Sequence, residues 1–268
     1  MVSLPGENPH GLVSADYVLS LHRPDTGRYD GRMNSFDHTI LSFFNQFAQH
    51  SWTIDSLIMT ISDSDLLKGY LSLPLLWWAW FRGPRQEEDR RTVLLTIVGA
   101  LSAVAVARLL QLTLPYRPRP IHTAGLQFTI PYSMPADFLE GWSSFPSDHA
   151  ALFFALATGL WLVSPVIGLF GFLHAALLVS FPRVYVGLHF PTDILSGALL
   201  GVTAVVIIWK SRGLARPLLD DILKRSHSSP HLFYPALFIL TSELAHLFKD
   251  SRWLAENLWH LVKAAAGH

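Results

Sequence analysis

The chain has 268 residues, half of them hydrophobic and only 15% charged, and its mean hydropathy is +0.32. Soluble domains carry about a quarter charged residues, so this composition favours a membrane protein. The 20 basic and 20 acidic residues cancel, which leaves no bulk charge to recruit nucleic acid. The absence of cysteine excludes disulfides, thiol catalysis and cysteine-based zinc sites.

The N-terminal part of the chain is polar at first and then becomes amphipathic. The first 30 residues contain no apolar run of the kind that forms a signal peptide, so we expect insertion to depend on the spanning helices. The stretch Phe36–Ile61 has apolar residues at helical spacing, interrupted by polar ones. This pattern predicts either an N-terminal interfacial amphipathic helix or helix pair, or a packed cap. We assign residues 1–65 to the polar tail and these interfacial helices.

Apolar runs follow, long enough or nearly long enough to cross about 30 Å of hydrocarbon. The five runs are Leu66–Phe81, Thr92–Leu114, Ala150–Val163, Val166–Phe181 and Ile194–Trp209. Only Ser164-Pro165 separates the third from the fourth, which predicts a tight helical hairpin. A sixth segment, Leu232–Phe248, is weaker because Glu243 and His246 lie within it.

These runs predict an all-α fold, a polytopic membrane helical bundle of five to six spans. Residues 66–210 would form the core of the protein within the membrane. Residues 211–268 would form a cytoplasmic link, a sixth membrane helix if residues 232–248 span, and a tail. We find no internal repeat and no second domain.

Charged loops predict the orientation of the bundle. Basic residues cluster after the first span and after the fifth, at Arg82, Arg85, Arg90 and Arg91 and at Lys210, Arg212, Arg216, Lys224 and Arg225. The positive-inside rule places both clusters in the cytoplasm. The loops Pro115–Pro146 and Pro182–Pro191 then fall on the outer side. We therefore expect an integral protein of a bacterial inner membrane, with its functional site on the periplasmic face.

Three short patches lie at the outer ends of predicted spans. They are Arg117-Pro118-Arg119-Pro120, then Pro146-Ser147-Asp148-His149, and finally Arg183 followed by His189 and Asp193. Each patch alone has a plainer explanation, such as an interfacial anchor or a structural histidine. Charged groups at membrane helix ends need a reason, however, and three such patches on one face indicate a shared site.

The residue types in these patches suit a phosphoryl group. Asp193 falls in the first helical turn after His189, close enough to accept a hydrogen bond from one imidazole nitrogen and leave the other as a nucleophile. Ser147 opens a helix whose unpaired N–H groups favour an anion. His149 could protonate a departing alkoxide as general acid.

Arg119 and Arg183 supply planar guanidinium groups that match phosphate oxygens. Phosphoryl transfer depends on positioning and charge neutralisation, which arginines provide without a metal. We therefore predict no metal and no cofactor. A metal site formed by His149, His189 and Asp193 has enough ligands, but the arginines would repel a dication.

Together the patches resemble the type 2 phosphatidic acid phosphatase superfamily, whose pattern is Lys-x6-Arg-Pro, Pro-Ser-Gly-His and Ser-Arg-x5-His-x3-Asp. Matching positions are Arg119-Pro120, then Pro146, Ser147 and His149, then Arg183, His189 and Asp193, within a similarity that covers roughly residues 92–209. The resemblance implies that His189 forms a phosphohistidine, Asp193 orients it and His149 is the acid. It also implies that Arg119, Arg183 and Ser147 bind the phosphate.

Three departures from this pattern bear on the site. Leu112 stands where the family has lysine, so Arg108 or Arg117 would have to supply the charge, and we favour Arg117. Asp148 replaces the family's glycine and adds a negative charge, although its backbone N–H remains available to a phosphate. Pro182 replaces a serine before Arg183.

The sequence thus predicts a membrane phosphatase that hydrolyses the phosphate or diphosphate end of a lipid. Its expected partners are this lipid substrate and membrane lipids, with no nucleic acid and no obligate protein partner evident. The alternatives are a lipid-to-lipid phosphotransferase and, because of Leu112 and Asp148, an inactive lipid-binding relative. Undecaprenyl diphosphate, phosphatidate, phosphatidylglycerol phosphate and a lipid A phosphate are all candidate substrates.

Overall fold

A computed structural model describes residues 33–259 except 84, 124, 136, 250, 252, 255 and 256. The predicted polar tail therefore lies outside the described residues up to residue 32. The regular elements of the described part are all helical, which confirms the all-α fold. They are α2 (Ser35–Asn45), α3 (Trp52–Asp63), α4 (Asp65–Phe81), α5 (Gln86–Thr113), η1 (Pro120–His122), α6 (Asp148–Val163), α7 (Pro165–His174), the π-helical η2 (Ala175–Ser180), α8 (Phe181–Tyr185), α9 (Pro191–Lys210), α10 (Arg212–Ser228) and α11 (Pro230–Ala245).

Three helical segments of the described chain are long and apolar enough to cross a membrane. They are Gln86–Thr113, Pro165–Tyr185 and Pro191–Lys210. α6 is apolar but has only 16 residues, so it is about 24 Å long. α4 and α11 are similarly short, with 17 and 16 residues. Membrane-spanning character beyond the three candidates, and with it the count of five to six spans, stays a prediction.

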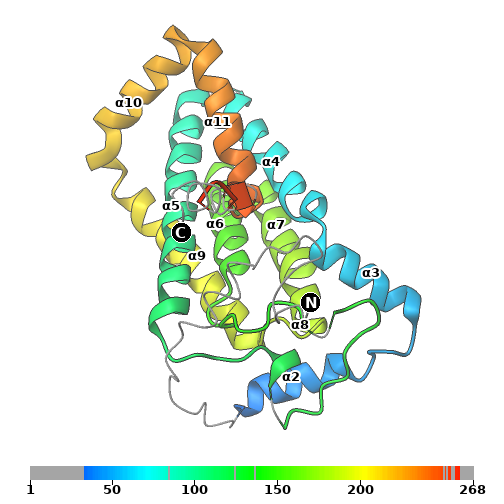
Figure 1. The fold of residues 1–268 in the computed structure, drawn as a ribbon. Coiled ribbons are helices and arrows are strands. Elements are labelled where there is room, and N and C mark those ends of the chain that lie inside the picture. The colour runs from blue at the N-terminus through cyan, green and yellow to red at the C-terminus, as the bar shows by residue number, and fades with distance from the viewer. Residues whose placement is uncertain are drawn as a thin grey trace.

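The centre of the bundle is α6, which packs against α5, α7 and α9 (Figure 1). Leu152 and Leu156 of α6 are buried in a core that also includes Trp80 of α4. Ser164 alone separates α6 from α7, and the two helices pack together as the predicted hairpin.

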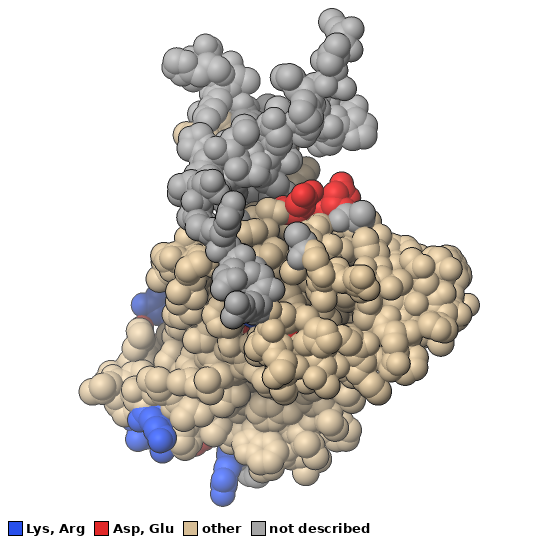
Figure 2. Space-filling view, turned by 90° about the horizontal axis from the view of Figure 1, so that it is seen from below, with Lys and Arg blue, Asp and Glu red and all other residues tan. Residues whose placement is uncertain are grey.

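The stretch that predicted one or two interfacial helices contains the pair α2 and α3. Ser51 caps α3, since its hydroxyl accepts a hydrogen bond from the backbone N–H of Ile54. Phe43, Phe47 and Trp52 are exposed on this pair. The surface at this end of the molecule carries few charged side chains (Figure 2). An interfacial position for α2 and α3 fits this surface and stays a prediction.

Helix direction brings distant segments to one end of the bundle. α4, α6 and α9 begin where α5 and α8 end, and the loop between α5 and α6 joins them there. The two basic clusters flank the opposite end, near α10 (Figure 1). The residues of the three sequence patches therefore share one end, as the motifs require.

Candidate active site

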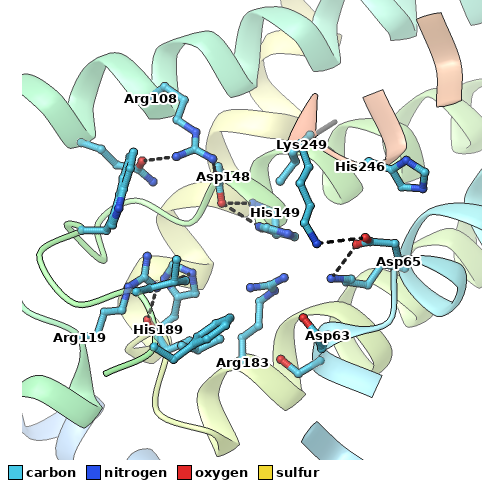
Figure 3. A pocket seen from close by; sticks show the side chains of 18 of the residues that line it. Asp63, Asp65, Arg108, Arg119, Asp148, His149, Arg183, His189, His246 and Lys249 are labelled. Atoms are coloured by element: carbon cyan, nitrogen blue, oxygen red, sulfur yellow. Dashed lines mark hydrogen bonds and ion pairs between the residues drawn. The ribbon is translucent and has the colours of Figure 1, made fainter. Parts of the chain in front are cut away.

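A cavity of about 410 Å³ lies among the converging helix ends. Its wall contains five of the predicted site residues, namely Arg119, Asp148, His149, Arg183 and His189. Figure 3 shows these side chains, contributed by the α5–α6 loop, α6, α8 and the α8–α9 turn, around one space. The two histidines and two arginines that the sequence predicts for phosphoryl transfer thus share one cavity.

His189 is buried at 2% exposure and held in one orientation. Its Nδ1 lies 2.9 Å from the carbonyl oxygen of Ser144 and 3.6 Å from Oδ2 of Asp193. A carbonyl oxygen can only accept, so Nδ1 carries the proton and donates it to Ser144. The other ring nitrogen, Nε2, therefore keeps its lone pair, as a nucleophile requires. Burial lowers the pKa of His189, which favours this neutral form.

The turn before His189 explains the spacing from Arg183. The carbonyl oxygen of Arg183 accepts hydrogen bonds from the backbone N–H groups of Leu188 and His189, at 2.9 and 3.2 Å. Gly187 lies inside this turn with φ +78°, and a Cβ there would be 2.6 Å from the ring of Phe128. Glycine is therefore the residue that this turn accepts.

Two buried guanidinium groups face the cavity. Arg119 donates from Nη1 to the carbonyl oxygen of Leu188 at 2.7 Å, which fixes it beside His189. The Nε atoms of Arg119 and Arg183 are buried and find no hydrogen-bond partner among the described residues. Buried donors normally have partners, so these two indicate that an anion belongs in the cavity.

His149 shares a carboxylate with Arg108. Its Nδ1 lies 2.9 Å from Oδ1 of Asp148, and Oδ2 of Asp148 is 2.5 Å from Nη2 of Arg108. A carboxylate fixes the proton on Nδ1 and leaves Nε2 of His149 for a substrate proton. The negative charge that Asp148 introduces is therefore neutralised by Arg108, the residue that lies one turn before Leu112.

Arg117 and Asp193 lie behind the nucleophile. Arg117 donates to Asp193 at 2.5 Å and to Asp37 of α2 at 2.7 Å. Asp193 also accepts a hydrogen bond from the backbone N–H of Phe190 at 2.7 Å. Neither Arg117 nor Asp193 belongs to the cavity wall formed by the described residues. Arg108 lies in that wall and Arg117 does not, and the replacement of the family's lysine by either arginine stays a prediction.

Ser147 is also placed away from the wall formed by the described residues. It is fully buried as the N-cap of α6, and its hydroxyl accepts from the backbone N–H of Ala150 at 3.4 Å. Its own N–H donates to the carbonyl oxygen of Asp193 at 3.1 Å. Ser147 thus joins the starts of α6 and α9, and its predicted contact with phosphate stays a prediction.

Three contributors to the site were not found in the sequence. Lys68 of α4 lines the cavity at 5% exposure and pairs with Asp65 at 3.2 Å. It lies inside the predicted span Leu66–Phe81, where a charged residue is itself a signal of function. Asp37 and the carbonyl of Ser144 carry no such signal. Within the described residues, no group of three or more His, Asp or Glu side chains is placed to hold a metal ion.

This arrangement defines the class: a helical protein with three candidate membrane spans among its described residues, whose helix ends enclose a cavity lined by two histidines and two buried arginines. Residues 93–216 match the family model of the PAP2 superfamily. The match confirms the resemblance that the three motifs predict over this part of the chain.

Relatives with known names support the same placement. The undecaprenyl-diphosphatase BcrC of Bacillus subtilis is 23% identical over 192 residues, which is 70% of this chain and 90% of that protein. An undecaprenyl-diphosphatase of Sulfolobus acidocaldarius is 46% identical over 59 residues, 22% of this chain and 28% of that protein. The crystal structure of Aquifex aeolicus LpxE aligns with a TM-score of 0.51 and 24% identity, over 66% of this chain and 96% of LpxE. The LpxE likeness shows a shared fold.

Proposed function

We propose that this protein is a membrane phosphatase that removes the terminal phosphate of a lipid phosphate or lipid diphosphate through a phosphohistidine at His189. One observation carries the proposal. The unprotonated Nε2 of His189 lies in a cavity wall together with two buried arginines whose Nε donors have no partner among the described residues. That combination provides a nucleophile and a charge-neutralising site for one phosphate.

The first half of the reaction forms a bond between His189 Nε2 and phosphorus while the bond to the lipid oxygen breaks. His149 donates a proton from Nε2 to that leaving oxygen, so it begins this step as the imidazolium. Arg119 and Arg183 neutralise the phosphoryl oxygens, and Lys68 adds a third cation from α4. Nδ1 of His189 keeps its proton throughout and donates the hydrogen bond to the carbonyl oxygen of Ser144.

The second half hydrolyses the phosphohistidine. His149, now neutral, takes a proton from water as the water oxygen attacks phosphorus. The bond from Nε2 of His189 to phosphorus breaks, inorganic phosphate leaves, and His149 is again protonated. Two histidines in one cavity therefore complete a cycle that consumes only the lipid ester and water.

The names of the relatives support a lipid diphosphate such as an undecaprenyl diphosphate among the substrates. A lipid substrate fits a site at one end of apolar helices, because the acyl or prenyl tail can remain in the bilayer while the phosphate enters the cavity. Five or six spans, a bacterial inner membrane and a periplasmic site form part of the same proposal. This topology is supported by the position of the two basic clusters, which lie at the end of the bundle opposite to the cavity.

The test is a phosphate-release panel with purified protein in detergent. The panel contains the four candidate lipids, with and without a chelator. We expect release from at least one lipid, no effect of the chelator, and loss of release in His189→Ala. His231→Ala is the matched control, because His231 is exposed on α11 at the opposite end of the molecule. Unchanged release by folded His189→Ala would refute the mechanism.

A further inference from the structure

The chain beyond the family match returns to the cavity. α11 runs back along α4, and a Cβ at Gly69 would lie only 2.7 Å from the Cβ of Ala245. Leu244 and Leu247 are buried in the same core as α4 and α6. The end of α11 therefore packs against Gly69, the residue that follows Lys68, at the wall of the cavity.

A tight turn follows α11 and redirects the chain. Leu247 and Phe248 both have φ in the left-handed region, at 52° and 57°, which residues with a side chain rarely adopt. The backbone N–H of Phe248 donates to the carbonyl oxygen of Glu243 at 2.7 Å and closes the turn. Two consecutive unfavourable conformations persist only where the surroundings enforce them. Here they direct the next residue, Lys249, toward the site.

Lys249 lines the same cavity as the arginines and histidines. Figure 3 shows its side chain extending between His149 and Asp65. Its Nζ lies 3.8 Å from Oδ2 of Asp65, while Oδ1 of that carboxylate is 3.2 Å from Nζ of Lys68. The two ammonium groups are thus separated by one carboxylate. The buried ammonium group of Lys68 belongs to the proposed phosphate site, and the exposed ammonium group of Lys249 lies beside that site.

The cations of the wall differ in how tightly they are paired. Five Lys and Arg side chains face three carboxylates there. Asp148 is already neutralised by Arg108, and Asp65 alone is shared by two lysines. Asp63 and Asp65 face Lys68 and Lys249 on the remaining side of the wall. Lys249 has the longer contact with Asp65, 3.8 Å against 3.2 Å for Lys68, so its ammonium group is the less tightly paired of the two and can bind a second phosphate.

We propose that Lys249 binds the phosphate that stays on the lipid after cleavage, and so makes the site selective for lipid diphosphates over lipid monophosphates. This inference rests on the proposed function and names its substrate class. Lys249 lies outside residues 93–216, so the family match does not assign it. Lys249 is thus a specificity-determining residue, because it neutralises the charge on the lipid monophosphate that departs as the leaving group.

The experiment compares a diphosphate and a monophosphate of the same prenol as substrates for Lys249→Ala. A hydrogen bond to a charged group is strong, so we expect kcat/KM for the diphosphate to fall on the order of tenfold. For the monophosphate it should change less than about twofold. Lys249→Arg, which keeps the charge, should restore most of the diphosphate activity, and the exposed Lys224→Ala on α10 serves as matched control.

Each outcome decides one proposal. If the wild type hydrolyses both lipids and Lys249→Ala lowers both equally or neither, the selectivity role is wrong and the phosphatase stands. An equal loss together with a lower unfolding temperature would assign Lys249 to the ion pair with Asp65 alone, which also overturns the inference. If the wild type hydrolyses neither prenyl lipid, the selectivity for lipid diphosphates is wrong, and the proposed function fails only if the other lipids of the panel also release no phosphate.

Discussion

The buried carboxylate of Asp37 accepts a hydrogen bond from the guanidinium of Arg117 at 2.7 Å, although the two residues are 80 positions apart. The same carboxylate accepts from the backbone N–H and the hydroxyl of Thr192, at 2.8 and 2.7 Å. Because Arg117 also pairs with Asp193, α2 is connected through two charged groups to the residue that faces His189. An N-terminal helix outside the family match thus supports the candidate nucleophile.

Asp37→Asn tests this connection. Removing one partner of a buried ion pair costs about 3–5 kcal/mol of folding free energy, and we expect a loss at the lower end because asparagine keeps one oxygen. Misplacing Asp193 should lower kcat/KM on the order of tenfold, which corresponds to about 1.4 kcal/mol. Thermal unfolding and phosphate release measure the two effects. The exposed Asp221→Asn, which removes a surface pair with Arg225, should change neither.

The pH dependence of the reaction should reflect His189. Burial lowers its pKa below the ordinary value of 6.5, hydrogen bonding to Asp193 opposes this, and the charge of Arg119 adds to the lowering. A lowered pKa keeps the nucleophile neutral to more acidic pH, so the acid limb of kcat/KM should lie below 6.5. Asp193→Asn removes the opposing influence and should move the limb to still lower pH. An acid limb that moves to higher pH in Asp193→Asn would contradict the assignment to His189. Ionisation of the substrate cannot cause such a shift, because it is the same for the wild type and the variant.

The pair of Arg108 and Asp148 gives a double-mutant cycle. Arg108→Leu leaves the Asp148 carboxylate unpaired in the phosphate cavity, where it repels the substrate, so KM should rise on the order of tenfold. Asp148→Gly added to Arg108→Leu removes the repulsion and should recover most of the loss. Additive effects in kcat/KM would show that the two residues act separately.

The absence of cysteine makes the membrane orientation directly testable. Glu140→Cys in the α5–α6 loop and Arg216→Cys in α10 place single thiols on exposed residues near opposite ends. In intact cells, a membrane-impermeant maleimide should label the first and not the second. Labelling of the second alone would place the site on the cytoplasmic face and reverse the predicted topology.

Sequence reasoning succeeded where structure is determined locally. The turn from Arg183 to His189 is held by backbone hydrogen bonds to the carbonyl oxygen of Arg183. The spacing of the two residues in the sequence therefore determines their relative positions. The break at Ser164-Pro165 likewise ends one helix and begins the next. Helix starts place His149 and Asp193 without any knowledge of tertiary packing.

Contacts between distant segments were beyond that reasoning. Arg117 was favoured as a phosphate ligand because it neighbours Arg119, but Asp37 engages it from a helix that pattern alone does not position. His189 donates to the backbone carbonyl of Ser144. Every residue has such a carbonyl, so the sequence gives no sign of this contact. Lys68 was accessible to sequence reasoning, since a lysine in an apolar run requires an explanation.

Trapping the covalent intermediate tests the phosphohistidine at His189 most directly. The protein is mixed with a lipid diphosphate radiolabelled in its terminal phosphate and quenched in alkali, in which phosphohistidine survives, and the labelled peptide is mapped. A phosphohistidine at His189 predicts an alkali-stable, acid-labile label on this residue that persists in His231→Ala and disappears in His189→Ala. A label on another residue, or turnover by the wild type with no label at any quench time, would contradict it.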